Sequence, residues 1–323
     1  MPPLLETRNL KKYFPVRKGF LMRTVAALRA VDGVSLSVDR GKTLGIVGES
    51  GCGKSTLGRT IIRLSEPSAG DIFFDSERFN DVRGLELRQQ RRRMQMIFQD
   101  PFSSLNPRHT VLAIVREPLD VHNVGRASER QDRVAELLGK VGIKAGHLNR
   151  YPHEFSGGQR QRISIARAIA LNPDLVVADE PVSALDVSIQ AQILNLLLDL
   201  QTDLGLTYVF ISHDLAVVEH FCNEIMVMYL GRIVERAPRE RLFADPRHPY
   251  TQALLDAIPI PGRGKRRQRR VLQGDLPSPV APPKGCAFHT RCPFKKDICS
   301  RETPVLKAVG DDREHQTACW LYE

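Results

Sequence analysis

The sequence predicts an α/β fold that contains a mainly parallel sheet, an inserted helical subdomain and a small C-terminal extension. Short apolar runs rich in β-branched residues alternate with longer helical patterns over the first 235 residues. Nearly continuous apolar runs are typical of strands buried on both faces, and strand–helix–strand spacing favours parallel pairing. Helical patterns without a strong strand follow residue 101, which indicates the inserted subdomain.

Four strands and four helices of this fold stand out in the pattern. The strands are expected at 43–48 ("TLGIVG"), 175–179 ("LVVAD"), 207–212 ("TYVFIS") and 224–231 ("EIMVMYLG"). The helices are expected at 54–64, 159–171, 187–204 and 214–222.

The composition changes after residue 258, where proline, glycine and basic residues accumulate. Such a segment is typical of a linker. We therefore predict one large domain over residues 1–258, with its helical subdomain at about 101–170. An extension over residues 259–323 follows, and it holds four of the six cysteines.

The 323 residues are 42% hydrophobic, which suffices for a full core. The start lacks a secretory apolar stretch, and no run reaches the roughly 18 to 20 apolar residues of a membrane span. We therefore expect a protein of the cytosol, where thiols stay reduced.

Much of the net charge of +10 lies in two clusters, at 88–93 and 263–270. Runs of this kind are usually solvated faces or linkers, and no zinc-finger or RNP-type motif accompanies them. We expect an anionic membrane surface, and no nucleic acid, as the electrostatic partner.

The segment "GIVGESGCGKST" at 45–56 contains the phosphate-loop pattern G-x-x-x-x-G-K-[ST] between an expected strand and an expected helix. Its glycines let backbone N–H groups point at phosphate oxygens, and the helix start adds a positive dipole end. Lys54 is expected to neutralise the β- and γ-phosphates, and Ser55 to bind Mg²⁺. The expected nucleotide contacts are Gly48, Glu49, Ser50, Gly51, Cys52, Gly53, Lys54, Ser55 and Thr56.

Two carboxylates end the expected strand of "LVVADEP" at 175–181. The carboxyl ends of parallel strands are where such a sheet presents a ligand site. Asp179 is expected to hold Mg²⁺, and Glu180 to orient or deprotonate the attacking water. The alternative is that either carboxylate only caps the next helix.

The segment "FSGGQRQRISIARA" at 155–168 resembles the signature sequence of ABC ATPases, with Phe155 where leucine is usual. A serine and two glycines before a helix expose N–H groups at a positive helix end. The resemblance implies nucleotide contacts from Ser156, Gly157, Gly158 and Gln159. It also implies an ATP-hydrolysing cassette fold.

Further motifs of that family follow in the family's order. Gln99 in "IFQDP" matches the Q-loop, which also implies a Mg²⁺ contact; Asp186 in "SALD" matches the D-loop; and His213 in "FISHD" matches the switch histidine. The adenine-stacking aromatic is expected at Tyr13 or Phe14. Phe14 is preferred because members of the most similar branch carry an aromatic there.

Longer segments resemble the ATP-binding subunits of dipeptide and oligopeptide permeases (DppF/OppF type), among them "FQDPFSSLNPR", "ADEPVSALDVSIQAQILNLL" and "RHPYTQALL". This resemblance implies an ATPase on the cytoplasmic face of the inner membrane that drives peptide import. Its implied partners are a second, related cassette, two transmembrane permease subunits and, indirectly, a peptide-binding protein. Nickel as cargo is one alternative, and a nucleic-acid-associated ABC ATPase is another.

Four cysteines lie close together near the end of the chain: Cys286, Cys292, Cys299 and Cys319. Their spacing is looser than the C-x₂₋₄-C pairs usual for structural zinc, and four thiolates suit either zinc or an iron–sulfur cluster. Spacing leaves this choice open. The resemblance, through the "GCxFxxRC" tail, implies a [4Fe–4S] cluster, while Cys52 and Cys222 are expected to be ordinary small residues.

Overall fold

The computed structural model describes residues 2–19, 23–257 and 274–322, and the chain divides into two compact units. Unit 1 comprises Met1–Val38, Thr43–Asn80 and Ser212–Glu323; unit 2 comprises Asp39–Lys42 and Asp81–Ile211. The expected boundary at 258/259 and the basic run at 263–270 lie outside the described residues, so the domain division stays a prediction.

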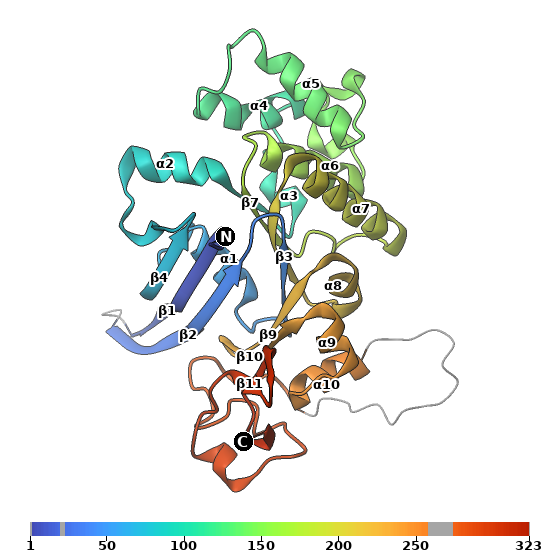
Figure 1. The fold of residues 1–323 in the computed structure, drawn as a ribbon. Coiled ribbons are helices and arrows are strands. Elements are labelled where there is room, and N and C mark those ends of the chain that lie inside the picture. The colour runs from blue at the N-terminus through green and yellow to red at the C-terminus, as the bar shows by residue number, and fades with distance from the viewer. Residues whose placement is uncertain (1, 20–22, 258–273, 323) are drawn as a thin grey trace. The chain divides into compact units, whose positions relative to one another are not determined.

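Unit 1 contains a four-stranded antiparallel sheet in the order β2-β1-β4-β5 (Figure 1). Its strands are β1 (Leu5–Lys18), β2 (Arg23–Val38), β4 (Ala69–Phe74) and β5 (Glu77–Arg78). Burial alternates along the last part of β2, where Val34, Leu36 and Val38 face the core. This alternation is typical of a strand with one covered face.

The second set of strands in unit 1 has the order β11-β12-β10-β9-β3. Its strands are β3 (Thr43–Val47), β9 (Glu224–Tyr229), β10 (Arg232–Pro238), β11 (Lys307–Val309) and β12 (Asp312–Thr317). Strands β3 and β9 pair in parallel, and the other pairs are antiparallel. The C-terminal strands β11 and β12 therefore continue the sheet that carries β3.

The helices of unit 1 are short. They are α1 (Lys54–Ile61), α8 (Leu215–Phe221), α9 (Arg239–Ala244), α10 (Pro249–Asp256), η4 (Asp297–Ser300) and η5 (Trp320–Tyr322), with η1 (Phe79–Asp81) where the chain leaves the unit.

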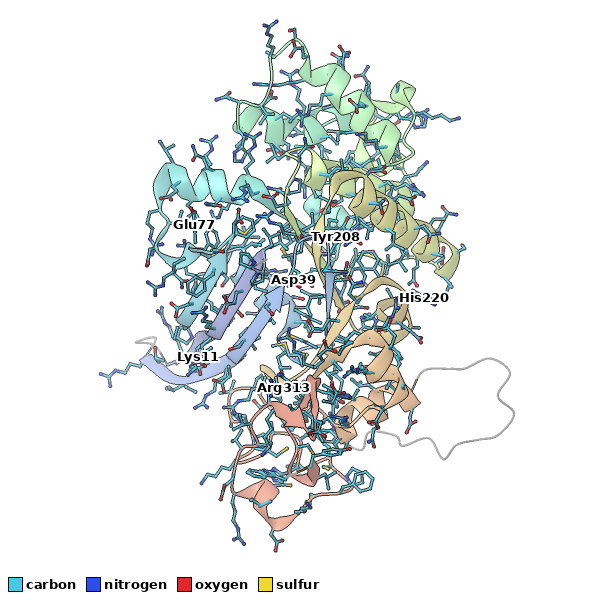
Figure 2. All side chains as sticks on the ribbon, viewed as in Figure 1. Lys11, Asp39, Glu77, Tyr208, His220 and Arg313 are labelled. Carbon is cyan, nitrogen blue, oxygen red and sulfur yellow. The ribbon has the colours of Figure 1, made fainter. Side chains whose placement is uncertain are left out.

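Unit 2 contains three parallel strands in the order β8-β7-β6. They are β6 (Met94–Ile97), β7 (Leu175–Asp179) and β8 (Thr207–Ser212, whose last residue opens the next stretch of unit 1). Both faces of β7 and β8 are buried. Tyr208 on β8 (Figure 2) is fully buried, and its hydroxyl donates to the carbonyl of Leu197 at 3.2 Å.

The helices of unit 2 are α2 (Gly84–Arg93), α3 (Pro101–Ser104), α4 (Val111–Val121), α5 (Arg130–Lys140), η2 (Ala145–His147), η3 (Pro152–Glu154), α6 (Gly157–Ile169) and α7 (Val187–Leu204). Between residues 101 and 170 the described chain forms helices without a strand. Helix α4 begins where Thr110 accepts a hydrogen bond from the N–H of Ala113, a typical N-cap.

The four expected strands are confirmed at β3, β7, β8 and β9, and the four expected helices at α1, α6, α7 and α8. Several boundaries differ from expectation by one to three residues. Helix α1 ends at Ile61, three residues early, and α6 begins at Gly157, two residues early, because Ser156 caps it. No helix in the described part of the chain is both long and apolar enough to cross a membrane.

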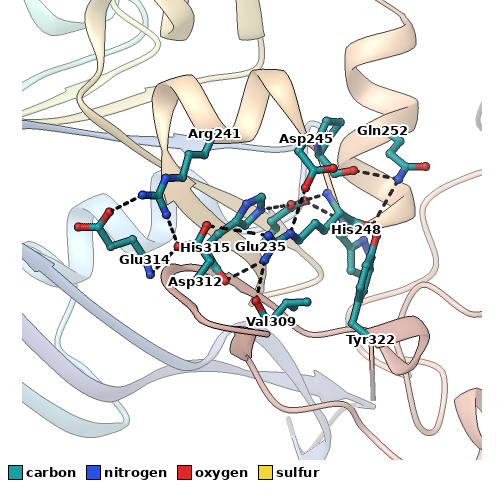
Figure 3. A network of polar contacts seen from close by, with 12 residues as sticks. Glu235, Arg241, Asp245, His248, Gln252, Val309, Asp312, Glu314, His315 and Tyr322 are labelled. Atoms are coloured by element: carbon teal, nitrogen blue, oxygen red, sulfur yellow. Dashed lines mark hydrogen bonds and ion pairs between the residues drawn. The ribbon is translucent and has the colours of Figure 1, made fainter.

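A buried carboxylate joins the C-terminal strands to the rest of unit 1 (Figure 3). Glu235 on β10 is fully buried and accepts from the N–H groups of Arg247 and His248, at 2.7 and 3.0 Å. Its Oε1 also lies 2.7 Å from Nε2 of His315 on β12. Burial lowers the pKa of His248 to about 4 against the opposing charge of Glu235, so this imidazole is neutral at pH 7.

Candidate functional site

The loop between β3 and α1 has the backbone that a phosphate site needs. Gly53 has a φ of +112°, and a Cβ there would lie 2.0 Å from the carbonyl oxygen of Ala30. At Gly48 a Cβ would lie 2.2 Å from the carbonyl oxygen of Met228. A side chain at either position would clash with backbone, so glycine is required for the loop to pack against Ala30 and Met228.

Lys54 opens helix α1 and is only 4% exposed. Its ammonium donates to the carbonyls of Gly48 and Glu49 at 2.7 and 3.0 Å, so backbone oxygens of the loop hold the positive charge of Lys54 beside the loop. Ser55 and Thr56 follow in the first turn, where backbone N–H groups are unsatisfied within the helix. This arrangement presents one cation and several N–H donors to an anion.

The remaining loop residues differ in exposure. Ser50 and Gly51 are exposed, whereas Cys52 is 1% exposed and its pKa is raised by burial. The Cys52 thiol is therefore a buried, protonated packing group at neutral pH. Cys222 is equally buried, and its Sγ would lie 2.8 Å from a Cβ at Gly45 on β3.

Three more predicted residues lie in unit 1. His213 follows the last residue of β8 and is exposed. On β1 the hydroxyl of Tyr13 donates to Asp32, which is also paired with Arg232 at 2.7 Å. Phe14 is 40% exposed, with the Lys12 ammonium 5.0 Å from its ring centroid, so part of its ring is accessible while Tyr13 serves a polar network.

The two predicted carboxylates end β7 in unit 2. Asp179 is 1% exposed and Glu180 is 9% exposed. Glu180 has a φ of +46°, a left-handed conformation that is uncommon outside glycine and is typical of functional sites. The N–H of Glu180 donates to the carbonyl of Ile211 at 2.9 Å, which fixes this turn beside β8.

The structure brings Gln99 and Glu180 together within unit 2. Nε2 of Gln99 donates to Oε2 of Glu180 at 3.0 Å, although 81 residues separate them. Gln99 follows β6, and β6 pairs with β7, so their carboxyl ends meet at one edge. An amide beside a carboxylate can hold that carboxylate in one orientation.

The predicted signature residues start helix α6. The hydroxyl of Ser156 accepts from the N–H of Gln159 at 3.3 Å, and Gln159 Oε1 accepts from the N–H of Ser156 at 3.0 Å, which forms a capping box. A Cβ at Gly158 would lie 2.6 Å from the Ile189 side chain. The packing of this turn therefore favours glycine at position 158, in addition to the nucleotide contact that the sequence predicts there.

Asp186 lies at the N-terminal boundary of α7 and is exposed. Its side chain makes no capping hydrogen bond to the helix. The neighbouring Val187 is 81% exposed, an unusual fraction for a branched apolar residue. This turn therefore presents a carboxylate and an apolar side chain to the outside of the chain.

The four C-terminal cysteines lie in one segment of unit 1, the cysteine module (residues 285–319). None forms a disulfide, and the N–H of Cys286 donates to the carbonyl of Cys299 at 2.8 Å. Burial, and to a smaller extent the charges of the other three thiols, raise the pKa of Cys286 to about 11. The four sulfurs are thus electrostatic neighbours.

Across the ranges 2–19, 23–257 and 274–322, no group of three or more His, Cys, Asp or Glu side chains has an arrangement that could hold a metal ion. The cysteine module therefore contains the donor set but not a preformed coordination site. Four thiols without disulfides suit soft metals chemically.

Two residues that contact the phosphate loop were missed by the sequence analysis. Tyr250 on α10 accepts from the N–H of Glu49 at 2.8 Å, and Arg291 in the cysteine module pairs with the Glu49 carboxylate at 2.8 Å. Both touch the phosphate loop from segments about 200 residues or more away in sequence. The only signals were "HPY" and "TRC", which say nothing about distance.

Comparison with known families gives two matches. Residues 31–183 match the family described as ABC transporter, and residues 234–299 match the one described as oligopeptide/dipeptide transporter, C-terminal region. The first match includes the phosphate loop, the signature and the two carboxylates. The second includes most of β10, all of α10 and three of the four C-terminal cysteines.

Individual similar proteins agree with these two family matches. The chain is 54% identical to the oligopeptide transport ATP-binding protein AppF of Bacillus subtilis, over 99% of this chain and 97% of the relative. It is 52% identical to the dipeptide transport ATP-binding protein DppF of Haemophilus influenzae, over 96% and 95%. Among solved structures, the cassette MJ0796, dimeric in a post-hydrolysis state with ADP and Pi, matches at 31% identity and a TM-score of 0.65, over 73% of this chain and 98% of that one.

Proposed function

Since this chain belongs to the peptide-import ATP-binding proteins of the ABC transporters, we propose that it hydrolyses ATP to drive the uptake of dipeptides or oligopeptides. The observation that carries the proposal is the phosphate loop, whose glycines, buried lysine and helix start form an anion site. The match of the C-terminal region to peptide transporters favours peptide cargo over nickel and over a nucleic-acid role.

In this function each predicted residue has a defined task. The loop from Gly48 to Thr56 binds the phosphates, and Lys54 leaves its resting carbonyls to neutralise them. Phe14 stacks on adenine, because its ring is accessible while Tyr13 is engaged with Asp32. Ser55, Gln99 and Asp179 would hold Mg²⁺, which would supply positive charge to the β- and γ-phosphates.

Hydrolysis forms a bond between a water oxygen and the γ-phosphorus and breaks the bond to the ADP oxygen. Glu180 orients this water and accepts its proton, with Gln99 fixing the carboxylate. His213 contacts the γ-phosphate. The capped, glycine-rich start of α6 and the exposed Asp186 contact the nucleotide of a second cassette.

The partners that follow are a second ATP-binding subunit, related but not identical, and two transmembrane permease subunits. A peptide-binding protein acts indirectly by delivering cargo. The site of action is the cytoplasmic face of the inner membrane, where anionic lipid suits the +10 chain. A cassette dimer is supported by MJ0796, which was solved as one.

The test is reconstitution. We expect the purified subunit alone to hydrolyse ATP slowly, and the assembled cassettes with permease and binding protein in proteoliposomes to hydrolyse ATP and take up dipeptide. A Ser156→Arg change should lower turnover at least about tenfold while the same chain still binds ATP, because α6 acts on the other subunit's nucleotide. Full turnover by a monomer at any concentration would contradict the shared site.

We further propose that the four thiols of the cysteine module ligate a [4Fe–4S] cluster, with zinc as the alternative. The support is the donor set itself: four thiols that are electrostatic neighbours and form no disulfide. The module is too small for its own core, so a bound metal centre would staple it. The cluster's role here is structural.

Iron analysis tests this assignment. Anaerobically purified protein should be brown and contain about four iron atoms per chain, and Cys292→Ser should lose colour and iron. Cys222→Ser, which changes a buried thiol outside the module, should keep both. Zinc without iron would replace the cluster by the alternative, and absence of any metal would contradict both.

A further inference from the structure

An ion pair connects the cysteine module to the phosphate loop. The guanidinium of Arg291 donates two hydrogen bonds to the Glu49 carboxylate, at 2.8 and 3.1 Å. The Arg291 side chain is 7% exposed and the Glu49 side chain 23% exposed. This bidentate geometry fixes orientation as well as distance, and the low exposure limits screening by solvent.

Glu49 is held at three points. Its N–H donates to the Tyr250 hydroxyl at 2.8 Å, and its carbonyl accepts from the Lys54 ammonium at 3.0 Å. Its carboxylate is held by Arg291. The residue that follows the first glycine of the loop therefore connects the resting position of Lys54 to two C-terminal segments.

Tyr250 and Arg291, which hold Glu49 from the C-terminal segments, are themselves supported by one aromatic cluster. The ring centroid of Phe288, in the cysteine module, lies 5.3 Å from that of Tyr229 and 5.4 Å from that of Tyr250. The N–H of Arg291 donates to the carbonyl of Phe288 at 3.0 Å. Phe288 is 1% exposed, so Arg291 extends from a packed and rigid support.

The charge of Glu49 explains what this support does. A carboxylate in a loop that binds phosphates repels them, and in a partly desolvated site the repulsion is stronger than in water. Arg291 neutralises this charge and also holds the Glu49 carboxylate in one position. Removing Arg291 would leave an uncompensated negative charge beside the anion site.

We propose that Arg291 is a positioning residue for ATP binding, through which the cysteine module holds the phosphate loop and cancels the charge of Glu49. The inference rests on the proposed ATP-binding function and deepens it, because it makes the C-terminal module part of the nucleotide site. It does not depend on what the four thiols bind.

The test is a double-mutant cycle on the purified full chain, with a fluorescent ATP analogue as the probe. Arg291→Ala should weaken binding about tenfold, since hydrogen bonds to charged groups are the strong ones. Arg291→Lys keeps the charge without the fork and should fall between wild type and Arg291→Ala. Glu49→Gln added to Arg291→Ala should recover most of the loss, because the repelling charge is gone. In the assembled transporter KM for ATP should rise more than kcat falls.

The matched control is Arg313→Ala, which removes an exposed arginine of the same module (Figure 2) and should leave binding unchanged. Wild-type affinity in Arg291→Ala, with or without a lower melting temperature, would overturn the proposal. So would a double variant that binds as weakly as Arg291→Ala, since the loss would then be general damage. Failure of the wild type to bind the probe would instead overturn the proposed function, and this proposal with it.

Discussion

Lys54→Ala is expected to reduce ATP hydrolysis by the assembled transporter at least about a hundredfold, and to weaken ATP binding as well. Removal of one preorganised electrostatic contact to a reacting group typically costs a factor of about 10² to 10³ in kcat. Lys54 is proposed to be such a contact, and it is buried at the start of α1. Steady-state hydrolysis and binding of a fluorescent ATP analogue measure the two effects.

The comparison variant is Lys42→Ala, which removes an exposed lysine just before β3. It should hydrolyse ATP like the wild type. Hydrolysis by Lys54→Ala within a factor of about three of wild type would contradict the role of the phosphate loop, because a buried cation at an anion site has few substitutes.

The elements around the phosphate loop could be predicted because local and global signals agree there. The apolar run of β3, the glycines and the helix pattern after Lys54 each point to strand, loop and helix. The structure also gives the reason for glycine at position 53, since a Cβ there would lie 2.0 Å from the backbone oxygen of Ala30. The glycines of the motif are therefore the residues that the close backbone contacts require.

The antiparallel sheet and the C-terminal strands were harder to predict. Strands β1 and β2 run for 14 and 16 residues with bulges, and their polar positions interrupt any simple alternation. Strand β12 reads "DREHQT", which has no apolar residue, and it is stabilised by pairing with β10 and by the buried contact of His315 with Glu235. Such elements depend on partners far away in sequence.

In the candidate site, too, one part of the arrangement could be predicted from the sequence and another part could not. Residue identities at the loop, the carboxylates and the signature follow from motifs, whereas the contacts that hold them do not. The approach of Gln99 to Glu180 spans 81 residues, and that of Arg291 to Glu49 spans 242. Only the folded chain brings these pairs into hydrogen-bond distance.

Glu180→Gln is expected to abolish most turnover while ATP binding persists. A positioned general base contributes a factor of about 10² to 10⁴, and glutamine cannot accept the proton from water. Glutamine has nearly the same shape, so β7 and its turn should be preserved. Because the γ-phosphate stays intact, the ATP-bound cassette dimer should accumulate, which size-exclusion chromatography with Mg²⁺ and ATP measures.

The local geometry makes this prediction specific. Glu180 has a φ of +46° and accepts a hydrogen bond from Gln99 at 3.0 Å, so its carboxylate is held in a strained turn for one orientation. Glu219→Gln changes an exposed carboxylate on α8 and should keep full turnover. If Glu180→Gln hydrolysed ATP at the wild-type rate, the proton would have to go elsewhere, and Glu180 would be a structural end to β7. If it failed to bind ATP, the substitution would have damaged the site itself. Retained binding with lost turnover is the one combination that identifies Glu180 as the base.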